Sequence, residues 1–199
     1  MQNKLDVAPP GDSTTIGPNI AYLHTIPAIL KAVEFMLCLF AFALAASFKN
    51  ALSHWSSYGL GRVDFFIFVM VVAWLGVIAL FLVYFLNIIN KLKQITPLVF
   101  IVLALLHLFG ALFILISTGL VLDDCITTRT AHTYRYSYCD YISAVTKTSC
   151  PVYEASGVCG FFAFIAVAFD AVLHVLKAVQ EYRIVQANRA SSAQPNEVL

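Results

Sequence analysis

The chain has 199 residues, of which 60% are hydrophobic and only 12% are charged, and its mean hydropathy is +0.83. Soluble domains carry about 25% charged residues, so this composition excludes a soluble enzyme and a disordered chain. The 12 Lys and Arg residues against 11 Asp and Glu residues leave a formal net charge of only +1, which is too small to attract DNA or RNA. The composition therefore predicts an integral membrane protein.

Four apolar segments are long enough to cross a bilayer, which takes about 20 helical residues. Each is continuously apolar rather than alternating, so helices are expected and not the strands of a barrel. The sequence thus predicts an all-α membrane protein with a four-transmembrane-helix bundle in residues 28–179, an N-terminal tail (1–27) and a C-terminal tail (180–199). The four predicted spans are residues 28–48, 65–86, 98–122 and 158–179.

Two patterns predict the orientation of this bundle. Basic residues number seven on the side of both tails and five on the other side, which favours cytosolic N- and C-termini. Four cysteines lie in or at the edge of the loop before the last span, and such a group predicts two disulfides in an oxidising compartment. We therefore expect a disulfide-bonded second outer loop, with all three pairings open. These cysteines are Cys125, Cys139, Cys150 and Cys159.

Polar side chains inside a membrane are costly and are candidates for function. Four lie within the spans, namely Glu34, His107, Asp170 and His174, and Lys31 precedes Glu34 by three residues and can pair with it. Helical spacing places the four on stripes of small residues, which typically face neighbouring helices. We predict that they form an intramembrane polar network. It acts either as a proton or ion relay or as interhelical hydrogen bonds worth about 0.6 kcal/mol each.

The stripes that carry these groups are predicted to be the packed faces of the first, third and fourth spans. They are Glu34, Cys38, Ala41, Ala45 and Phe48; Ala104, His107, Ala111, Ile114 and Thr118; and Gly160, Ala163, Val167, Asp170, His174 and Lys177.

The loop before the last span contains alternating aromatic residues. Tyr134, Tyr136 and Tyr138 would share one face of a short strand. They form either a partner-contact surface or a belt of tyrosines against lipid headgroups.

Enzyme and metal signatures are missing from the sequence. It has no H-E-x-x-H, no G-x-S-x-G and no phosphate-binding glycine loop, so catalytic residues and enzyme activity are not expected. The loop cysteines contain no C-x-x-C, so we expect no metal site, and no cofactor is expected either. Cys38 is predicted to be a packing residue. The terminal Glu197-Val198-Leu199 is compatible with a ligand for a PDZ domain.

Particular segments of the first and last spans resemble a known family. In residues 29–46, Lys31 and Glu34 stand shortly before an alanine-rich apolar run, and residues 160–171 carry Asp170 near the end of an apolar helix. With four spans and a larger second outer loop, residues 24–184 resemble the MARVEL-domain four-transmembrane proteins. Claudins and tetraspanins fit less well, because the first outer loop has no cysteine and the second has no Cys-Cys-Gly.

The resemblance implies a non-enzymatic membrane organiser in vesicle trafficking, membrane apposition or cell–cell junctions, located at the plasma membrane, on endomembrane vesicles, or both. Its expected partners are membrane lipids, including sterol-rich domains, and other membrane proteins in homo- or hetero-oligomers, and no nucleic acid. Apolar outer faces would select thick bilayers through hydrophobic matching. Two alternatives stay open: a small channel or proton-linked transporter that uses the polar network, and an adhesion or barrier protein that acts through the tyrosine loop. The outer-face aromatics would be Phe65, Phe66, Phe68, Phe81 and Phe85.

Overall fold

The structure is a computed structural model that describes residues 17–52, 61–89, 99–126, 128–131, 134–137 and 150–192. Helices dominate it, as expected for apolar segments whose backbone groups must be satisfied within the segment. The elements in chain order are the 3-10 helix η1 (Ile20–His24), α1 (Ile26–Leu52), α2 (Gly61–Phe85), α4 (Val99–Ile126), β1 (Thr128–Ala131), β2 (Tyr134–Ser137) and α6 (Cys150–Ser192).

Four of these helices, α1, α2, α4 and α6, are long and apolar enough to cross a membrane. This confirms the all-helical membrane architecture. The helices are longer than the predicted spans at most ends, because polar end residues such as Lys49 and Arg62 still continue the helical backbone. The helix α6 is the longest, with 43 residues.

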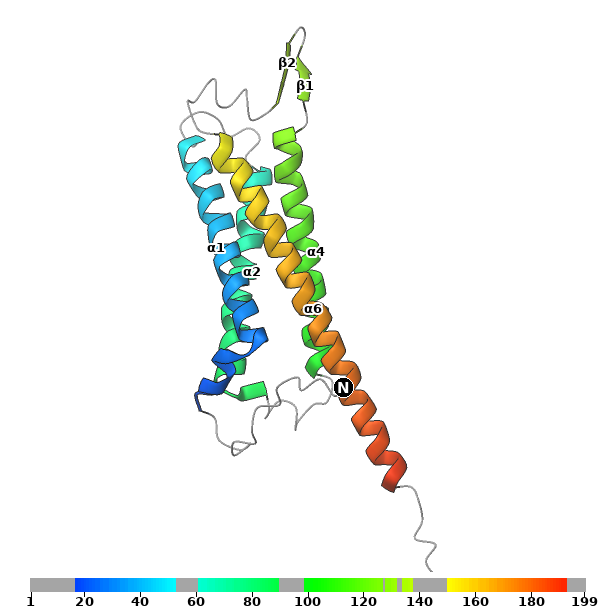
Figure 1. Cartoon of the computed structure of the whole chain (residues 1–199). Coiled ribbons are helices and arrows are strands. Elements are labelled where there is room, and N and C mark those ends of the chain that lie inside the picture. The colour runs from blue at the N-terminus through cyan, green and yellow to red at the C-terminus, as the bar shows by residue number, and fades with distance from the viewer. Residues whose placement is uncertain are drawn as a thin grey trace, which may run out of the picture.

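The four helices form a bundle in which α6 packs against both α4 and α1, while α2 packs against α1 and α4. Figure 1 shows α6 crossing the bundle and continuing past the other helices at the end where η1 lies. The antiparallel hairpin of β1 and β2 stands at the opposite end, with Thr128 paired to Ser137 and Ala131 to Tyr134.

The predicted packing stripes are confirmed on α1 and α4. All five residues on each stripe are buried, including the polar Glu34 and His107. On α6 the stripe is buried from Gly160 to His174, and Lys177 at its end is half-buried. One expectation is wrong: Phe66 is buried in the apolar core rather than on an outer face, because that side of α2 faces the bundle.

Close approach between α6 and its neighbours depends on two glycines. A Cβ atom on Gly160 would lie 2.6 Å from Thr118 Oγ1 and 3.0 Å from Phe66 Cε2. A Cβ atom on Gly157 would lie 2.9 Å from Leu122 Cδ2. Small residues at such crossings allow membrane helices to approach closely, so these glycines set how tightly α6 packs on α4.

Ion pairs join the helices at the end of the bundle near the hairpin. Arg62 Nη1 of α2 lies 3.0 Å from Asp123 Oδ2 and 2.7 Å from Asp124 Oδ1 of α4. Lys49 Nζ of α1 lies 2.5 Å from Asp64 Oδ1 of α2. The two basic side chains are about 40% exposed, so each pair contributes about 1 kcal/mol or less.

The disulfide expectation needs a correction at two positions. Cys125 and Cys159 are free thiols, so two disulfides among the four cysteines are not formed. Cys125 lies in α4, which extends further than the predicted span, and Cys159 lies in α6 within its predicted span. Both thiols therefore pack against the apolar core rather than lying in the loop. Cys150 is engaged rather than free, while Cys139 lies outside the described residues. A bridge at Cys150 therefore stays a prediction.

Candidate functional site

The four polar residues predicted inside the membrane come together in one buried cluster. Glu34 lies on α1, His107 on α4, and Asp170 and His174 on α6, and none is more than 5% exposed. A fifth residue, Lys31 of α1, joins them. We call these five residues the buried ionic cluster.

Lys31 is the centre of the cluster. Its Nζ atom lies 2.8 Å from Glu34 Oε2, 2.6 Å from Asp170 Oδ2 and 2.9 Å from His107 Nε2. The sequence predicted only its pairing with Glu34, because residues three apart share a helix face. The contacts to α4 and α6 depend on the bundle, which buries the Lys31 side chain to 2% exposure.

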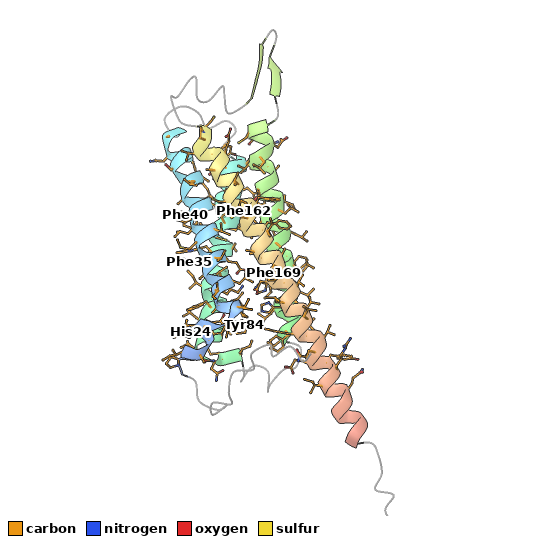
Figure 2. The ribbon with its side chains drawn as sticks, in the orientation of Figure 1. His24, Phe35, Phe40, Tyr84, Phe162 and Phe169 are labelled. Carbon is orange, nitrogen blue, oxygen red and sulfur yellow. The ribbon has the colours of Figure 1, made fainter. Side chains whose placement is uncertain are left out.

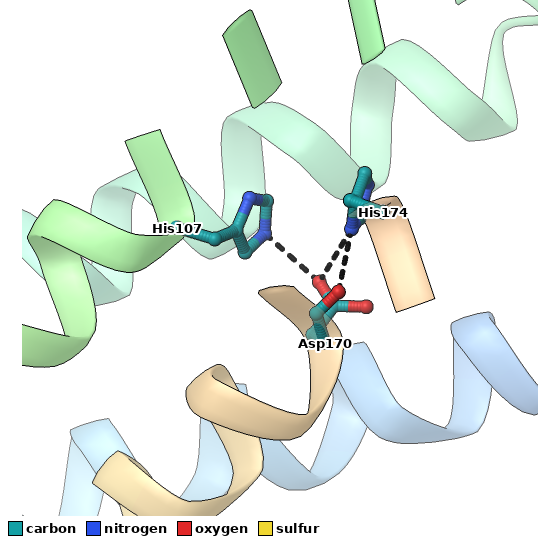
Figure 3. Close-up of side chains that lie close together, drawn as sticks. All are labelled: His107, Asp170 and His174. Carbon is teal, nitrogen blue, oxygen red and sulfur yellow. Dashed lines mark hydrogen bonds and ion pairs between the residues drawn. The ribbon is translucent and has the colours of Figure 1, made fainter. Parts of the chain in front are cut away.

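His107 makes contacts through both of its ring nitrogens. Its Nδ1 atom lies 2.7 Å from the carbonyl oxygen of Leu103, which only accepts hydrogen bonds, so Nδ1 carries a hydrogen and donates it. Its Nε2 atom lies 2.8 Å from Asp170 Oδ2 (Figure 3). The ring thus links α4 directly to α6.

His174 is held in one neutral tautomer by its partners. Its Nδ1–H donates to the backbone carbonyl of Asp170 at 2.8 Å, with Asp170 Oδ2 at 3.5 Å (Figure 3). Its Nε2 atom accepts a hydrogen bond from the Tyr84 hydroxyl at 2.8 Å. The ring stacks on that of His107, with centroids 4.4 Å apart and planes at 21°.

Two tyrosines that the sequence did not indicate extend the cluster toward η1. Tyr84 of α2 contacts His174 and stacks on Tyr22 of η1 with ring centroids 5.6 Å apart. Lys177 Nζ lies 5.8 Å from the centre of the Tyr84 ring. Figure 2 shows Tyr84 directed into the bundle near η1. No spacing rule could have found these residues, because each reaches the cluster from another helix.

Tyr22 lies outside the membrane-spanning helices and is buried to 8% exposure. Burial, and after it the negative charges of Asp170 and Glu34, raises the pKa of the Tyr22 phenol well above its usual value. Within the described residues the Tyr22 hydroxyl has no hydrogen-bond partner. The aromatic ring, not the hydroxyl, therefore anchors η1 to the bundle.

His107, Asp170 and His174 place three metal-ligand atoms within 4.8 Å of one another. The residue types suit zinc, but the geometry does not. Both histidines use Nδ1–H for a backbone carbonyl, and the stacked rings aim their lone pairs along nearly parallel planes rather than at one point. The Lys31 ammonium also lies within 3 Å of both Asp170 Oδ2 and His107 Nε2, where a metal ion bound by these two residues would have to sit. This arrangement suits a network of hydrogen bonds and ion pairs.

The tyrosines of the second outer loop can be placed only in part. Tyr134 and Tyr136 lie in β2, as expected for a short strand. Tyr138 and the C-terminal Glu197-Val198-Leu199 lie outside the described residues.

Residues 22–173 match the MARVEL family, defined as a membrane-associating domain. The match covers most of the chain, and the protein belongs to this family of membrane-organising proteins. Four of the five residues of the buried ionic cluster fall within the matched range, and His174 follows its last residue directly. No curated protein and no solved structure matches the chain.

Proposed function

We propose that this protein is a non-enzymatic membrane organiser that acts through lateral contacts with lipids and other membrane helices. One observation carries the proposal. Inside the bundle the charges of Lys31, Glu34 and Asp170 are directed at one another, whereas the outer faces of the same helices are apolar. What the bundle presents to the bilayer is thus a surface for lipids and helices, not a site for a polar substrate.

That outer surface is rich in large apolar side chains. Phe40, Phe162 and Phe169 are about half exposed on α1 and α6 (Figure 2). On α4 the exposed residues lie on several sides of the helix, because α6 and α2 are the helices that pack most closely on it. They include Val102, Leu105, Leu106, Phe109, Leu112, Phe113 and Ile116. Such a surface supports oligomerisation with copies of itself or with other membrane proteins, and contact with sterol-rich lipids.

The compartments in which we place this activity are cell–cell junctions of the plasma membrane and endomembrane vesicles, with both tails in the cytosol. The test is the location of a tagged copy at native expression level in cells that have contacts and active secretion. Concentration at contacts supports junctional organisation, and a punctate vesicular pattern supports trafficking. A diffuse distribution over all membranes would contradict the proposal.

A partner at the extreme C-terminus is a separate element of the proposal. The acid and the apolar residue of Glu197-Val198-Leu199 suit a PDZ domain, which adds the peptide as a strand. Removing these three residues should then change the location of the protein without changing its folding.

A second candidate function is proton-linked transport or a small channel. It is favoured by the chain of contacts from Tyr84 through His174, Asp170, His107 and Lys31 to Glu34, each 3.5 Å or shorter. Asp170→Asn should abolish proton or ion flux in liposomes if this function holds. The absence of flux from the unmodified protein would exclude it.

A third candidate, adhesion through the tyrosine loop, is supported by the hairpin of β1 and β2, which stands beyond the end of the helices (Figure 1). Replacing Tyr134, Tyr136 and Tyr138 by Ser should weaken adhesion between cells that express the protein. Unchanged adhesion would argue against this function.

A further inference from the structure

The contact between His107 and Asp170 is not explained by Lys31. Lys31 Nζ, His107 Nε2 and Asp170 Oδ2 form a nearly equilateral triangle with sides of 2.6, 2.8 and 2.9 Å. The angle at Nζ is therefore about 60°, whereas the N–H bonds of an ammonium diverge at the tetrahedral angle. One ammonium cannot direct straight hydrogen bonds along both edges.

The third edge of the triangle, between His107 and Asp170, needs a hydrogen that does not come from Lys31. His107 Nε2 and Asp170 Oδ2 are 2.8 Å apart, which is the length of a hydrogen bond, and among the described residues no well-directed hydrogen bond reaches Asp170 Oδ2. Without a hydrogen between them, both atoms would be acceptors that face each other with their lone pairs. The His107 Nδ1–H is already directed at Leu103 and cannot supply it.

His174 cannot supply this hydrogen either. Its Nδ1–H points to the backbone carbonyl of Asp170, and its Nε2 accepts from Tyr84. The hydrogen on the edge must therefore be bound to His107 Nε2 or to the carboxyl of Asp170.

The net charge of the cluster also indicates one additional proton. With both histidines neutral, Lys31 contributes one positive charge, and Glu34 and Asp170 contribute two negative charges. All five side chains are buried to 5% exposure or less, and an uncompensated charge in such surroundings is costly. One additional proton brings the cluster to zero net charge.

The other titratable groups around the cluster do not change this sum of charges. Among the described residues they are Tyr22 on η1, Cys38 on α1 and Tyr84 on α2, which are neutral acids near pH 7. Lys177 of α6 lies on the other side of the Tyr84–His174 pair, against the Tyr84 ring.

We propose that the buried ionic cluster is a proton-binding site, which holds one proton between His107 Nε2 and Asp170 Oδ2 in addition to the ammonium of Lys31. This proton connects α4 to α6. Its loss leaves one negative charge and two opposed acceptors at the junction of α1, α4 and α6, and separates the helices there. The inference does not depend on flux through the protein.

The test measures the proton directly in the full chain, reconstituted in lipid nanodiscs at neutral pH. Histidine ¹⁵N NMR identifies rings that carry hydrogens on both nitrogens, and Asp ¹³C labels identify a protonated carboxyl group. The sequence has five histidines, so His107→Gln assigns the signal of interest and His174→Gln is the matched control. We expect either a doubly protonated His107 or a protonated Asp170, and a neutral His174 with its hydrogen on Nδ1.

Two results would overturn the proposal. One is a neutral His107 together with fully ionised carboxylates. The other is a protonated Glu34, seen as a carboxylic acid infrared band that Glu34→Gln removes and Asp170→Asn does not. The unmodified protein with labelled His, Asp and Glu answers the question even where a variant does not fold.

Discussion

At the scale of single residues, Lys31 has the largest predicted effect on stability. It is the only side chain in the described part of the chain that contacts Glu34, His107 and Asp170 together. Lys31→Met leaves two buried acids without their cation. Breaking a buried pair in this way costs about 3–5 kcal/mol, so we expect a large fall in the midpoint of thermal unfolding in detergent.

Lys49→Met is the matched control for that experiment. It removes a lysine from the same helix and breaks a pair with Asp64, but both side chains are more than 40% exposed. We expect a change of about 1 kcal/mol or less. Equal effects of the two substitutions would contradict the central role of Lys31.

The ionisation of Tyr22 provides a pH prediction. Its pKa is raised by burial and by nearby negative charge, while an unfolded tyrosine has a pKa of about 10. The contribution of the neutral phenol to stability is therefore fully present below about pH 10. It is lost as the pH rises through the higher value of the folded state.

Absorbance titration of tyrosinate measures this directly. Tyr22→Phe should leave the titration curve of the folded protein unchanged up to about pH 10. A loss of amplitude below that pH would show that Tyr22 is accessible to water.

At the scale of the helices, the contact between α4 and α6 depends on Gly160. Gly160→Ala places a Cβ atom 2.6 Å from Thr118 Oγ1 and 3.1 Å from Met70 Cε. Such overpacking costs about 1–3 kcal/mol. Gly76→Ala is the control, because no atom lies within 4 Å of a Cβ at that position of α2. The midpoint of thermal unfolding should fall for Gly160→Ala and stay close to that of the unmodified protein for Gly76→Ala.

The three free cysteines in the helices give a chemical prediction. Alkylation after unfolding without a reductant should label Cys38, Cys125 and Cys159, which are free thiols in the structure. Mass spectrometry of peptides identifies the labelled positions. A disulfide that contains Cys125 or Cys159 would contradict this prediction.

At the scale of the whole molecule, the length of the helices sets the preferred bilayer. The candidate membrane span of α4 runs from Val99 to Cys125, which is 27 residues, with Asp123 and Asp124 at its end. At about 1.5 Å per residue this exceeds the typical hydrocarbon thickness of about 30 Å. We therefore expect the reconstituted protein to accumulate in the thicker phase of vesicles that contain thin and thick domains. Equal amounts of the protein in the thin and thick phases would show that hydrophobic matching does not determine its location.

Much of this architecture was determined by the sequence alone. In the bilayer core no water is present to form hydrogen bonds with the backbone, so a continuously apolar segment must pair its own N–H and C=O groups in a helix. The number and type of the spans therefore follow from the apolar segments of the sequence. The repeat of small and polar residues at helical spacing also identified the buried faces of α1 and α4, including Glu34 and His107.

Only the tertiary structure decided how those faces meet. Spacing along one helix shows that Lys31 can reach Glu34, but not that Asp170 and His107 lie at the same depth around its ammonium. It also could not show that Tyr84 lies next to His174, or that Cys125 lies within a helix. Such contacts join residues far apart in the chain, and their distances depend on the register of one helix against another, which close packing at Gly157 and Gly160 determines.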